Sequence, residues 1–453
     1  MSSENKQGFP AHNPLTSYWL KDPHPLASFR SSEYVPHECD IAIIGTGLAG
    51  VATAYHILSD PSINTAKLKV VLLEARQACS GATGRNGGHL KLAAWIARHT
   101  ILNFGYQAAE EVVAHQLNQL SAIHGIAEKE NIDCELRVTR SFDVFFDESH
   151  ASETREFISA CKEKGVAWAE DIEWIEASRS DEITGMKNTK GALGVPAVSL
   201  WPYKLVTGLL EKVLELGGKL YTETYVEKVE ELRNYTNLTT SRGSINARKT
   251  IFATNAYTAA LLPQFEGVIT PFKGQNSHLS PIPSFHPTKP LDYTYNLHFN
   301  SKYADYLNPR PDNGIILGGG KWTYEDKLDR AEWWNTTDDT NLINDASTEH
   351  FDLVMETHFQ GWEEAKAQHD SVWTGIMGQT PDSFPHIGRV PGSENQWLLA
   401  GFNGAGMTMI CTASRGIARM VLDERDYDET GLPKVFKSTF ERLGVKNSGF
   451  ASD

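Results

Sequence analysis

Residues 40–74 read DIAIIGTGLAGVATAYHILSDPSINTAKLKVVLLE, and this stretch decides the fold of the chain. It opens with a short, β-branched apolar run at 41–44, which is typical of a buried strand. The glycine turn 45–50 follows, then apolar residues at helical spacing, then a second apolar run, 68–73, that ends in Glu74. The order strand, glycine turn, helix, strand and acid predicts a dinucleotide-binding βαβ unit.

Each part of this unit has its own physical task. Gly45 permits the tight turn, Gly47 lets the backbone approach a pyrophosphate, and Gly50 lets the helix pack against the strand. Unpaired N–H groups at the start of the helix attract phosphate. Glu74 can accept hydrogen bonds from a ribose 2′-OH and would repel a 2′-phosphate, which argues against NADP. The alternative is a purely structural glycine turn, but the strands, the helix and the acid all agree with dinucleotide binding.

The composition is that of an ordinary globular protein. The chain has 453 residues, enough for two or three domains, and is 40% hydrophobic and 22% charged. Its net charge of −15 argues against nucleic acid or an anionic membrane as the main partner. Its five cysteines are scattered without a CxxC pair, which predicts a reducing compartment and no metal site. Because we find no signal-like core and no membrane-length apolar run, we expect a cytoplasmic protein.

A second glycine-rich stretch, ARQACSGATGRNGGH at 75–89, follows directly after Glu74. Glycines among small polar residues disfavour helix and strand, and suit a backbone that passes close to a ligand. The alternative is a flexible surface loop. The position directly after the ribose acid favours the ligand.

The rest of the chain alternates helical and strand patterns. Helices are predicted over about 101–131, 152–164 and 205–216, and strands over 137–146, 220–225, 226–232 and 249–257. We expect 325–350 to be an exposed acidic insertion. Near the C-terminus, a strand at 397–400 leads into the glycine turn GFNGAGM (401–407) and a helix to about 422, which forms a second place where helix N–H groups can face a ligand.

These blocks, in this order, resemble the flavin-dependent oxidoreductases of the D-amino-acid oxidase superfamily. The resemblance covers most of 38–425, and TGRNGG (83–88) and ATNAY (253–257) favour the γ-glutamylputrescine oxidase-like branch. It implies an α/β fold in which a discontinuous Rossmann-like FAD-binding domain is joined to a substrate domain with a mixed, largely antiparallel β-sheet and helices. The implied division is an arm at 1–37, the FAD-binding domain at 38–98, 194–270 and 371–427, the substrate domain at 99–193 and 271–370, and a tail at 428–453.

The resemblance also implies which residues hold the FAD. The first glycine turn faces the pyrophosphate, Glu74 the ribose and Val226 the adenine, while 85–89 and 404–406 lie along the flavin. The predicted cofactor-binding residues are Gly45, Thr46, Gly47, Leu48, Ala49, Gly50, Glu74, Ala75, Arg76, Ala82, Thr83, Arg85, Asn86, Gly87, Gly88, His89, Val226, Thr254, Asn255, Gly375, Gly404, Ala405, Gly406 and Met407. The position that carries a flavin-linked cysteine in sarcosine oxidase-like members is near Gly375 and is no cysteine here, so we expect the FAD to be non-covalent.

Two departures bear on the substrate. Many amino-acid-oxidising members place an arginine shortly after the Trp-x-Gly element, and sarcosine oxidase-like members a lysine after the last glycine turn. This chain has Met377 and Thr408 there. Because a buried carboxylate needs a fixed cation, we predict a small-molecule amine larger than a simple amino acid. Such an amine could pack on aromatic side chains, for which the candidates are Tyr293, Tyr295 and Trp322. The missing cations could also be replaced from elsewhere in the chain, by Arg85, Lys273 or Lys321.

The resemblance implies oxidation of a C–N bond. A neutral amine would lose a hydride to flavin, water would hydrolyse the imine, and O₂ would reoxidise the flavin with release of H₂O₂. His89 is the best-placed titratable candidate for a catalytic role, although a structural histidine fits equally well; His298 and Lys273 are weaker candidates. The alternatives are a dehydrogenase or tailoring enzyme that passes electrons to another acceptor, and a flavin-bearing protein without a free amine substrate.

Overall fold

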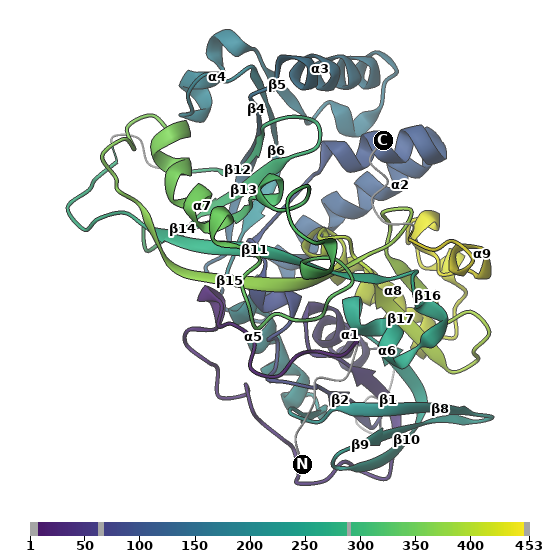
Figure 1. The fold of residues 1–453 in the computed structure, drawn as a ribbon. Coiled ribbons are helices and arrows are strands. Elements are labelled where there is room, and N and C mark those ends of the chain that lie inside the picture. Colours follow the sequence, from purple (N-terminus) through teal and green to yellow (C-terminus); the bar gives the residue numbers. More distant parts are fainter. Residues whose placement is uncertain (1–7, 62–67, 288–290, 448–453) are drawn as a thin grey trace.

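The computed structural model describes residues 8–61, 68–287 and 291–447, and the predicted βαβ unit lies at the centre of its first sheet (Figure 1). Strands β1 (Glu38–Ile44) and β2 (Val70–Leu73) pair in parallel, and helix α1 (Leu48–Leu58) connects them. On the other side of β1 lie β10 (Gly243–Phe252) and then β17 (Gln396–Ala400), both in parallel register. Distant segments of the chain therefore build one nucleotide-binding sheet, as predicted.

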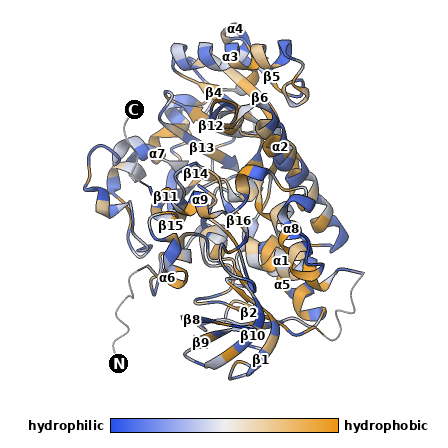
Figure 2. Ribbon diagram, turned by 90° about the vertical axis from the view of Figure 1, so that its right-hand side faces the viewer, coloured by the Kyte–Doolittle hydropathy of each residue, from blue (hydrophilic) through white to orange (hydrophobic). Residues whose placement is uncertain are grey.

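The remaining strands of this sheet lie at its edges. They are β7 (Lys219–Tyr221), β8 (Val226–Leu232), β9 (Tyr235–Thr240) and β16 (His386–Arg389). The strand predicted over 220–225 is shorter than expected, because β7 ends at Tyr221. Helices α5 (Pro202–Glu215) and α8 (Ile410–Leu422) pack on α1, and hydrophobic residues colour much of this region in Figure 2. Val51 and Ala54 of α1 have no exposed surface, so this helix forms the middle of the larger hydrophobic core.

Within the described residues, the second sheet has nine strands and is antiparallel except where β12 pairs with β4. Its strand order is β15-β11-β14-β13-β12-β4-β6-β3, with β5 beside β6. The strands are β3 (His89–Lys91), β4 (Arg137–Phe145), β5 (Glu173–Ile175), β6 (Gly191–Ser199), β11 (Thr270–Ser280), β12 (Thr294–His298), β13 (Ala304–Pro309), β14 (Ile315–Gly319) and β15 (Gln368–Gln379). The predicted mixed, largely antiparallel sheet is confirmed.

Helices cover the outer parts of the molecule. They are α2 (Ala94–Lys129), α3 (Glu148–Glu163), α4 (Ala177–Thr184), α6 (Thr258–Leu261), α7 (Asp345–His358) and α9 (Phe440–Leu443). Helix α2 begins earlier than the predicted 101–131 and is broken at Gly105, whose φ of 86° departs from helical geometry. Both views place β9 and β10 at one end of the molecule and α3 and α4 at the other (Figures 1 and 2). No helix within the described ranges is long and apolar enough to cross a membrane.

The prediction of an exposed insertion at 325–350 is wrong. Asp339 has no exposed surface, and Trp333 and Ile343 are also buried. The last six residues of this segment form the start of α7, with Asn344 as its N-cap. One of its carboxylates, Asp339, pairs with Arg76 and lies near Arg85, which the composition of the segment did not reveal.

The domain division stays a prediction, and the sheets cut across it. Strand β3 and most of β6 and of β15 lie within ranges assigned to the FAD-binding domain, yet all three strands belong to the second sheet. They bring the loop before β3 and the end of β15 to the place where the two sheets approach each other.

Candidate active site

A cavity of about 520 Å³ is lined by residues from both sheets. Every predicted cofactor-binding residue lines it except Gly50 and Gly88. Gly50 instead serves the helix packing, since a Cβ there would lie 1.9 Å from the Gly45 carbonyl oxygen. Gly88 has a φ of 68°, and a Cβ there would lie 2.6 Å from the Trp19 ring, so it fixes the loop against the N-terminal arm.

The first glycine turn opens α1 toward the cavity. Gly45 has a φ of 105°, a conformation that favours glycine, and a Cβ there would lie 2.6 Å from the Ala253 carbonyl oxygen. Gly47 is the N-cap of α1 and supplies no capping side chain. The amides of the first helical turn have no acceptor within the helix, and the hydroxyl of Thr83 accepts from one of them, the amide of Leu48, at 3.1 Å. The other amides of this turn suit a phosphate group.

Glu74 lies where the sequence predicted, at the tip of β2, and lines the cavity. Its Oε2 accepts hydrogen bonds from the backbone amide and hydroxyl of Thr46 at 2.9 and 2.7 Å, and its Oε1 accepts from the Arg76 amide at 3.0 Å. Oε2 therefore accepts two hydrogen bonds already, whereas Oε1 accepts one and has a second lone pair for a ribose hydroxyl. The acid therefore has two tasks, because it also fixes the glycine turn through Thr46.

Polar side chains of the second glycine-rich stretch hold the backbone in shape. Asn86 donates to the Thr83 carbonyl at 2.9 Å and accepts from the Gly88 amide at 2.8 Å. Arg85 is 2% exposed and donates to the carbonyls of Ser80 and Thr374, both at 2.8 Å. The loop is thus rigidly held against β15, and the alternative of a flexible surface loop does not apply.

A buried ion network supports this loop from behind. Asp339 accepts from Arg76 at 3.0 and 2.9 Å, and Arg85 Nε lies 3.6 Å from the same carboxylate. The Asp339 carbonyl also accepts from the Leu15 amide at 2.9 Å. Burial lowers the pKa of Arg85 to about 10, while Asp339 opposes that shift. One aspartate therefore ties the N-terminal arm to the cofactor loop, and no sequence pattern marked it.

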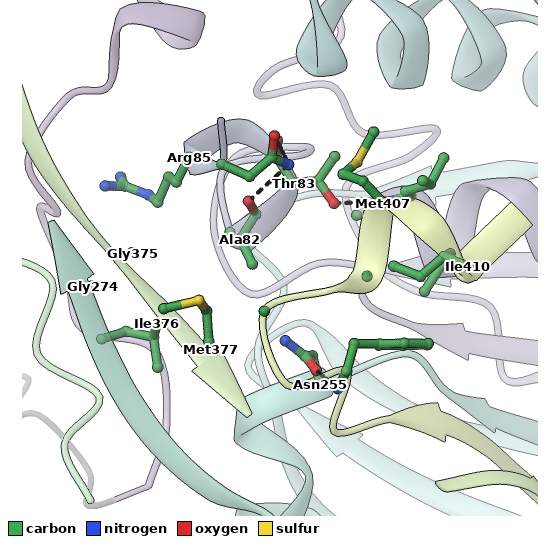
Figure 3. Close-up of a pocket in the computed structure, with 18 of the residues that line it drawn as sticks. Ala82, Thr83, Arg85, Asn255, Gly274, Gly375, Ile376, Met377, Met407 and Ile410 are labelled. Carbon is green, nitrogen blue, oxygen red and sulfur yellow. Dashed lines mark hydrogen bonds between the residues drawn. The ribbon is translucent and has the colours of Figure 1, made fainter. Parts of the chain in front are cut away.

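The last glycine turn closes the cavity opposite this loop. The Asn255 side-chain oxygen accepts from the amides of Gly401 and Phe402 at 3.0 and 3.2 Å, which fixes the turn. Gly404 has a φ of 77°, and a Cβ there would lie 3.4 Å from the Met377 sulfur. Figure 3 shows the Met377 side chain reaching from β15 into the space before this turn, while the Arg85 side chain extends away from Met407.

The N-terminal arm contributes to one end of the cavity, which sequence reasoning missed. Phe9 and Pro10 line the cavity beside Tyr225 and Val226. The rings of Phe9 and Tyr225 are 4.8 Å apart. These residues form an apolar slot at the end where Val226 was expected to face adenine.

The second sheet provides a polar wall. His89, Lys91, Asn276, Asn296 and Tyr306 line the cavity from strands β3, β11, β12 and β13. Burial, with a smaller contribution from Lys91, holds the pKa of His89 well below its usual range, so its ring is neutral at pH 7. His89 Nδ1 is buried and makes no hydrogen bond with the part of the chain that the structure describes. A neutral ring of this kind is a poor proton acceptor and a suitable hydrogen-bond partner for a ligand.

Several predicted substrate residues do not reach the cavity. The Tyr295 hydroxyl donates to the Thr184 carbonyl at 3.1 Å within the core of the second sheet. Lys273 lies outside the lining, near Asp338 and Asp339, and burial lowers its pKa. Three further candidates also fall outside the lining: Tyr293, His298 and Trp322. Lys321 does line the cavity and pairs with Glu325 at 2.7 Å.

The fold and the cavity define a dinucleotide-binding protein whose cavity is lined by residues from two mixed sheets, the first of which has a parallel centre. A family model described as FAD dependent oxidoreductase (DAO) matches residues 40–420, and the chain belongs to this family. The predicted family and its cofactor, FAD, are confirmed. The chain is an FAD-dependent oxidoreductase of the amine and amino-acid oxidase type.

Relatives extend over most of the chain. Gamma-glutamylputrescine oxidoreductase of Escherichia coli is 23% identical, with 84% of this chain and 83% of the relative covered. Glycine oxidase of Bacillus licheniformis is 23% identical, with 84% and 93% covered. Among solved structures, L-proline dehydrogenase from P. horikoshii is 20% identical with a TM-score of 0.66, covering 86% of this chain and 95% of that one. Glycine oxidase from Bacillus cereus is 16% identical with a TM-score of 0.68, covering 87% and 98%.

The residues present fit FAD. A Cβ on Gly47 would lie 3.1 Å from the Thr83 hydroxyl, and one on Gly87 would lie 2.6 Å from the Tyr306 ring, so neither position has room for a side chain. Both glycines line the cavity, where a ligand can approach their backbone. Polar partners along the cavity are supplied by Glu74, by the backbone amides at the start of α1 and by His89 Nδ1, which is buried without a hydrogen bond in the described structure. Among the described residues that line it there is no cysteine, in agreement with non-covalent binding.

Proposed function

We propose that this protein oxidises the C–N bond of a small amine whose nitrogen lies in the space between Met377, His89 and the last glycine turn. The observation that carries the proposal is the joining of the FAD cradle and the polar wall of the second sheet in one cavity. When bound, FAD accepts a hydride from the carbon next to the nitrogen and passes two electrons to O₂, which forms H₂O₂. Water then hydrolyses the imine to a carbonyl compound and an amine or ammonia.

The chain's own residues bind and orient the substrate. Met377, Met407 and Ile410 make one side of the space apolar, which favours an amine that has lost its proton. His89 stays neutral beside them and adds no positive charge. No side chain of the described lining is therefore required as an acid or base, since deprotonation can precede binding.

The relatives support an amino compound as the substrate class. Their names refer to glycine, L-proline and gamma-glutamylputrescine, all of which contain a C–N bond. Met377 and Thr408 occupy the two expected cation positions, and both line the cavity. We propose on this ground that glycine, sarcosine and D-alanine are poorer substrates than larger amines.

The experiment is anaerobic mixing of the holoenzyme with a panel of amino acids and amines. The substrate is the compound that bleaches the visible flavin absorbance fastest. If no amine or amino acid in the panel bleaches it, C–N oxidation is refuted. Oxygen consumption and H₂O₂ release then separate an oxidase from a dehydrogenase. The dehydrogenase alternative has a specific basis, because the similar structures include an L-proline dehydrogenase.

A further inference from the structure

The cavity wall formed by the second sheet carries an unusual charge pattern. Among the described residues that line the cavity, Glu74 is the only carboxylate, and it belongs to the glycine turn of the first sheet. The wall of the second sheet presents Lys91 and Lys321 to the cavity. A cationic tail on the substrate, as in a polyamine, would meet lysines there and no acid.

Lys91 is the more deeply buried of the two lysines. It is 8% exposed, and its Nζ donates one hydrogen bond, to the Ser141 hydroxyl at 3.1 Å. Asp143 Oδ1 is 4.0 Å away, which is an ion pair but too long for a hydrogen bond. An ammonium group has three donors, so Lys91 has donor capacity left at the cavity wall.

Asp143 sits behind Lys91 and does not reach the cavity. It is 3% exposed and lies outside the lining. Its Oδ1 accepts from the Asn296 amide at 2.7 Å, and its Oδ2 lies 3.8 Å from His298 Nε2. It stabilises the charged form of Lys91 against the effect of burial. Lys91, the cation of this pair, therefore lines the cavity, whereas the carboxylate of Asp143 stays within the protein.

From this geometry we infer that Lys91, with Asn296 beside it, binds a carboxylate or other anionic group on the substrate at a distance from the oxidised nitrogen. The inference rests on the proposed function and narrows its substrate class to amines with a remote acidic group. Lys91 lies on β3 and Met377 on β15, the two end strands of the sheet. Both residues line the same cavity, and Lys91 is two residues from His89 on β3.

The test compares matched amines with and without a terminal carboxylate. For the wild-type holoenzyme we expect 4-aminobutyrate or 6-aminohexanoate to exceed the matching alkylamine in kcat/KM by about tenfold or more, as charge-assisted hydrogen bonds are worth on the order of 1.5–3 kcal/mol. Lys91→Met should abolish this preference and leave the alkylamine rate within a few-fold, whereas Lys91→Arg should retain most of it. Lys321→Met is the matched control and should keep the preference, because its lysine already pairs with Glu325.

A binding measurement separates this inference from the proposed function. Glutarate, which has no amine to oxidise, should perturb the flavin absorbance of wild-type holoenzyme and of Lys321→Met, and not that of Lys91→Met. FAD content and circular dichroism show whether a variant has misfolded. If Lys91→Met has misfolded, Ser141→Ala is the second variant, because it removes the hydroxyl that accepts a hydrogen bond from Lys91. Equal rates for carboxylated and plain amines in the wild type, or equal losses for both in Lys91→Met, would overturn the anion site while C–N oxidation stands. Absence of turnover with every amine, together with Lys91-dependent glutarate binding, would refute C–N oxidation and leave the anion site intact.

Discussion

Asp339→Asn should damage both stability and FAD retention, although this residue lies in a polar segment far along the chain from the glycine turns. The carboxylate is fully buried and accepts two hydrogen bonds from Arg76, with Arg85 3.6 Å away. The asparagine keeps the shape and one acceptor but removes the charge. Two buried guanidinium groups then remain without their counter-ion.

The magnitude follows from this burial. Removing one partner of a buried ion pair costs about 3–5 kcal/mol, because the remaining charge is left uncompensated. At about 1 °C per kcal/mol for a chain of this length, the holoenzyme should lose roughly 3–5 °C in Tm. Arg85 holds the loop that lies along the cavity, so the Kd for FAD should rise by about tenfold or more, which is 1.4 kcal/mol.

Differential scanning fluorimetry and titration of the apoprotein with FAD measure the two effects. Asp338→Asn is the matched control: it makes the same charge change one residue away, where the carboxylate accepts from the Thr340 amide at 2.9 Å and is not buried to the same degree. It should cost about 1 kcal/mol, the worth of an ordinary hydrogen bond. A Tm within 2 °C of wild type for Asp339→Asn, with unchanged FAD affinity, would refute the view that this network supports the cofactor loop.

Three further predictions concern the cofactor and the pH dependence of the site. Glu74→Gln should weaken FAD binding by on the order of 1.5–3 kcal/mol in a fluorescence titration, because charge-assisted bonds to the ribose and Thr46 are lost; equal affinity would show that another residue holds the ribose. Acid precipitation should release the flavin into the supernatant, and flavin in the pellet would contradict non-covalent binding. Burial lowers the pKa of Lys91 to about 8, so the preference for carboxylated amines should be full well below pH 8 and fall as the lysine loses its proton above it; a preference that rises between pH 7 and 9 would contradict this.

The cofactor side of the site could be predicted from sequence because its determinants are local. Gly45, Gly47 and Glu74 act at fixed short spacings within one βαβ unit, and the strand, turn and helix around them are set by neighbouring residues. The same holds for the last glycine turn, where β17, the turn and α8 are consecutive. A pattern read along the chain therefore recovers the structure of both turns.

The supporting contacts could not be predicted in this way, because they join segments far apart in the chain. Asp339 meets Arg76 across 263 residues, and its own surroundings in the sequence are polar and acidic. Composition alone placed the segment at the surface, whereas Asp339 is buried against Arg76 and Arg85. For the same reason Tyr295 was expected at the cavity, although its strand turns that side chain toward α4 and the hydrophobic core.

Lys91 shows how a site on a sheet depends on strand order. The sequence places it two residues after His89, where nothing marks it as different from a surface lysine. Its environment arises because β6 pairs with both β3 and β4, which brings Lys91 within reach of Ser141 and Asp143, about fifty residues away in the chain. Because β12 then pairs with β4, Asn296 completes the group. Strand order therefore assembles around Lys91 a group of polar residues that the sequence near it does not reveal, and the proposed anion site depends on this group.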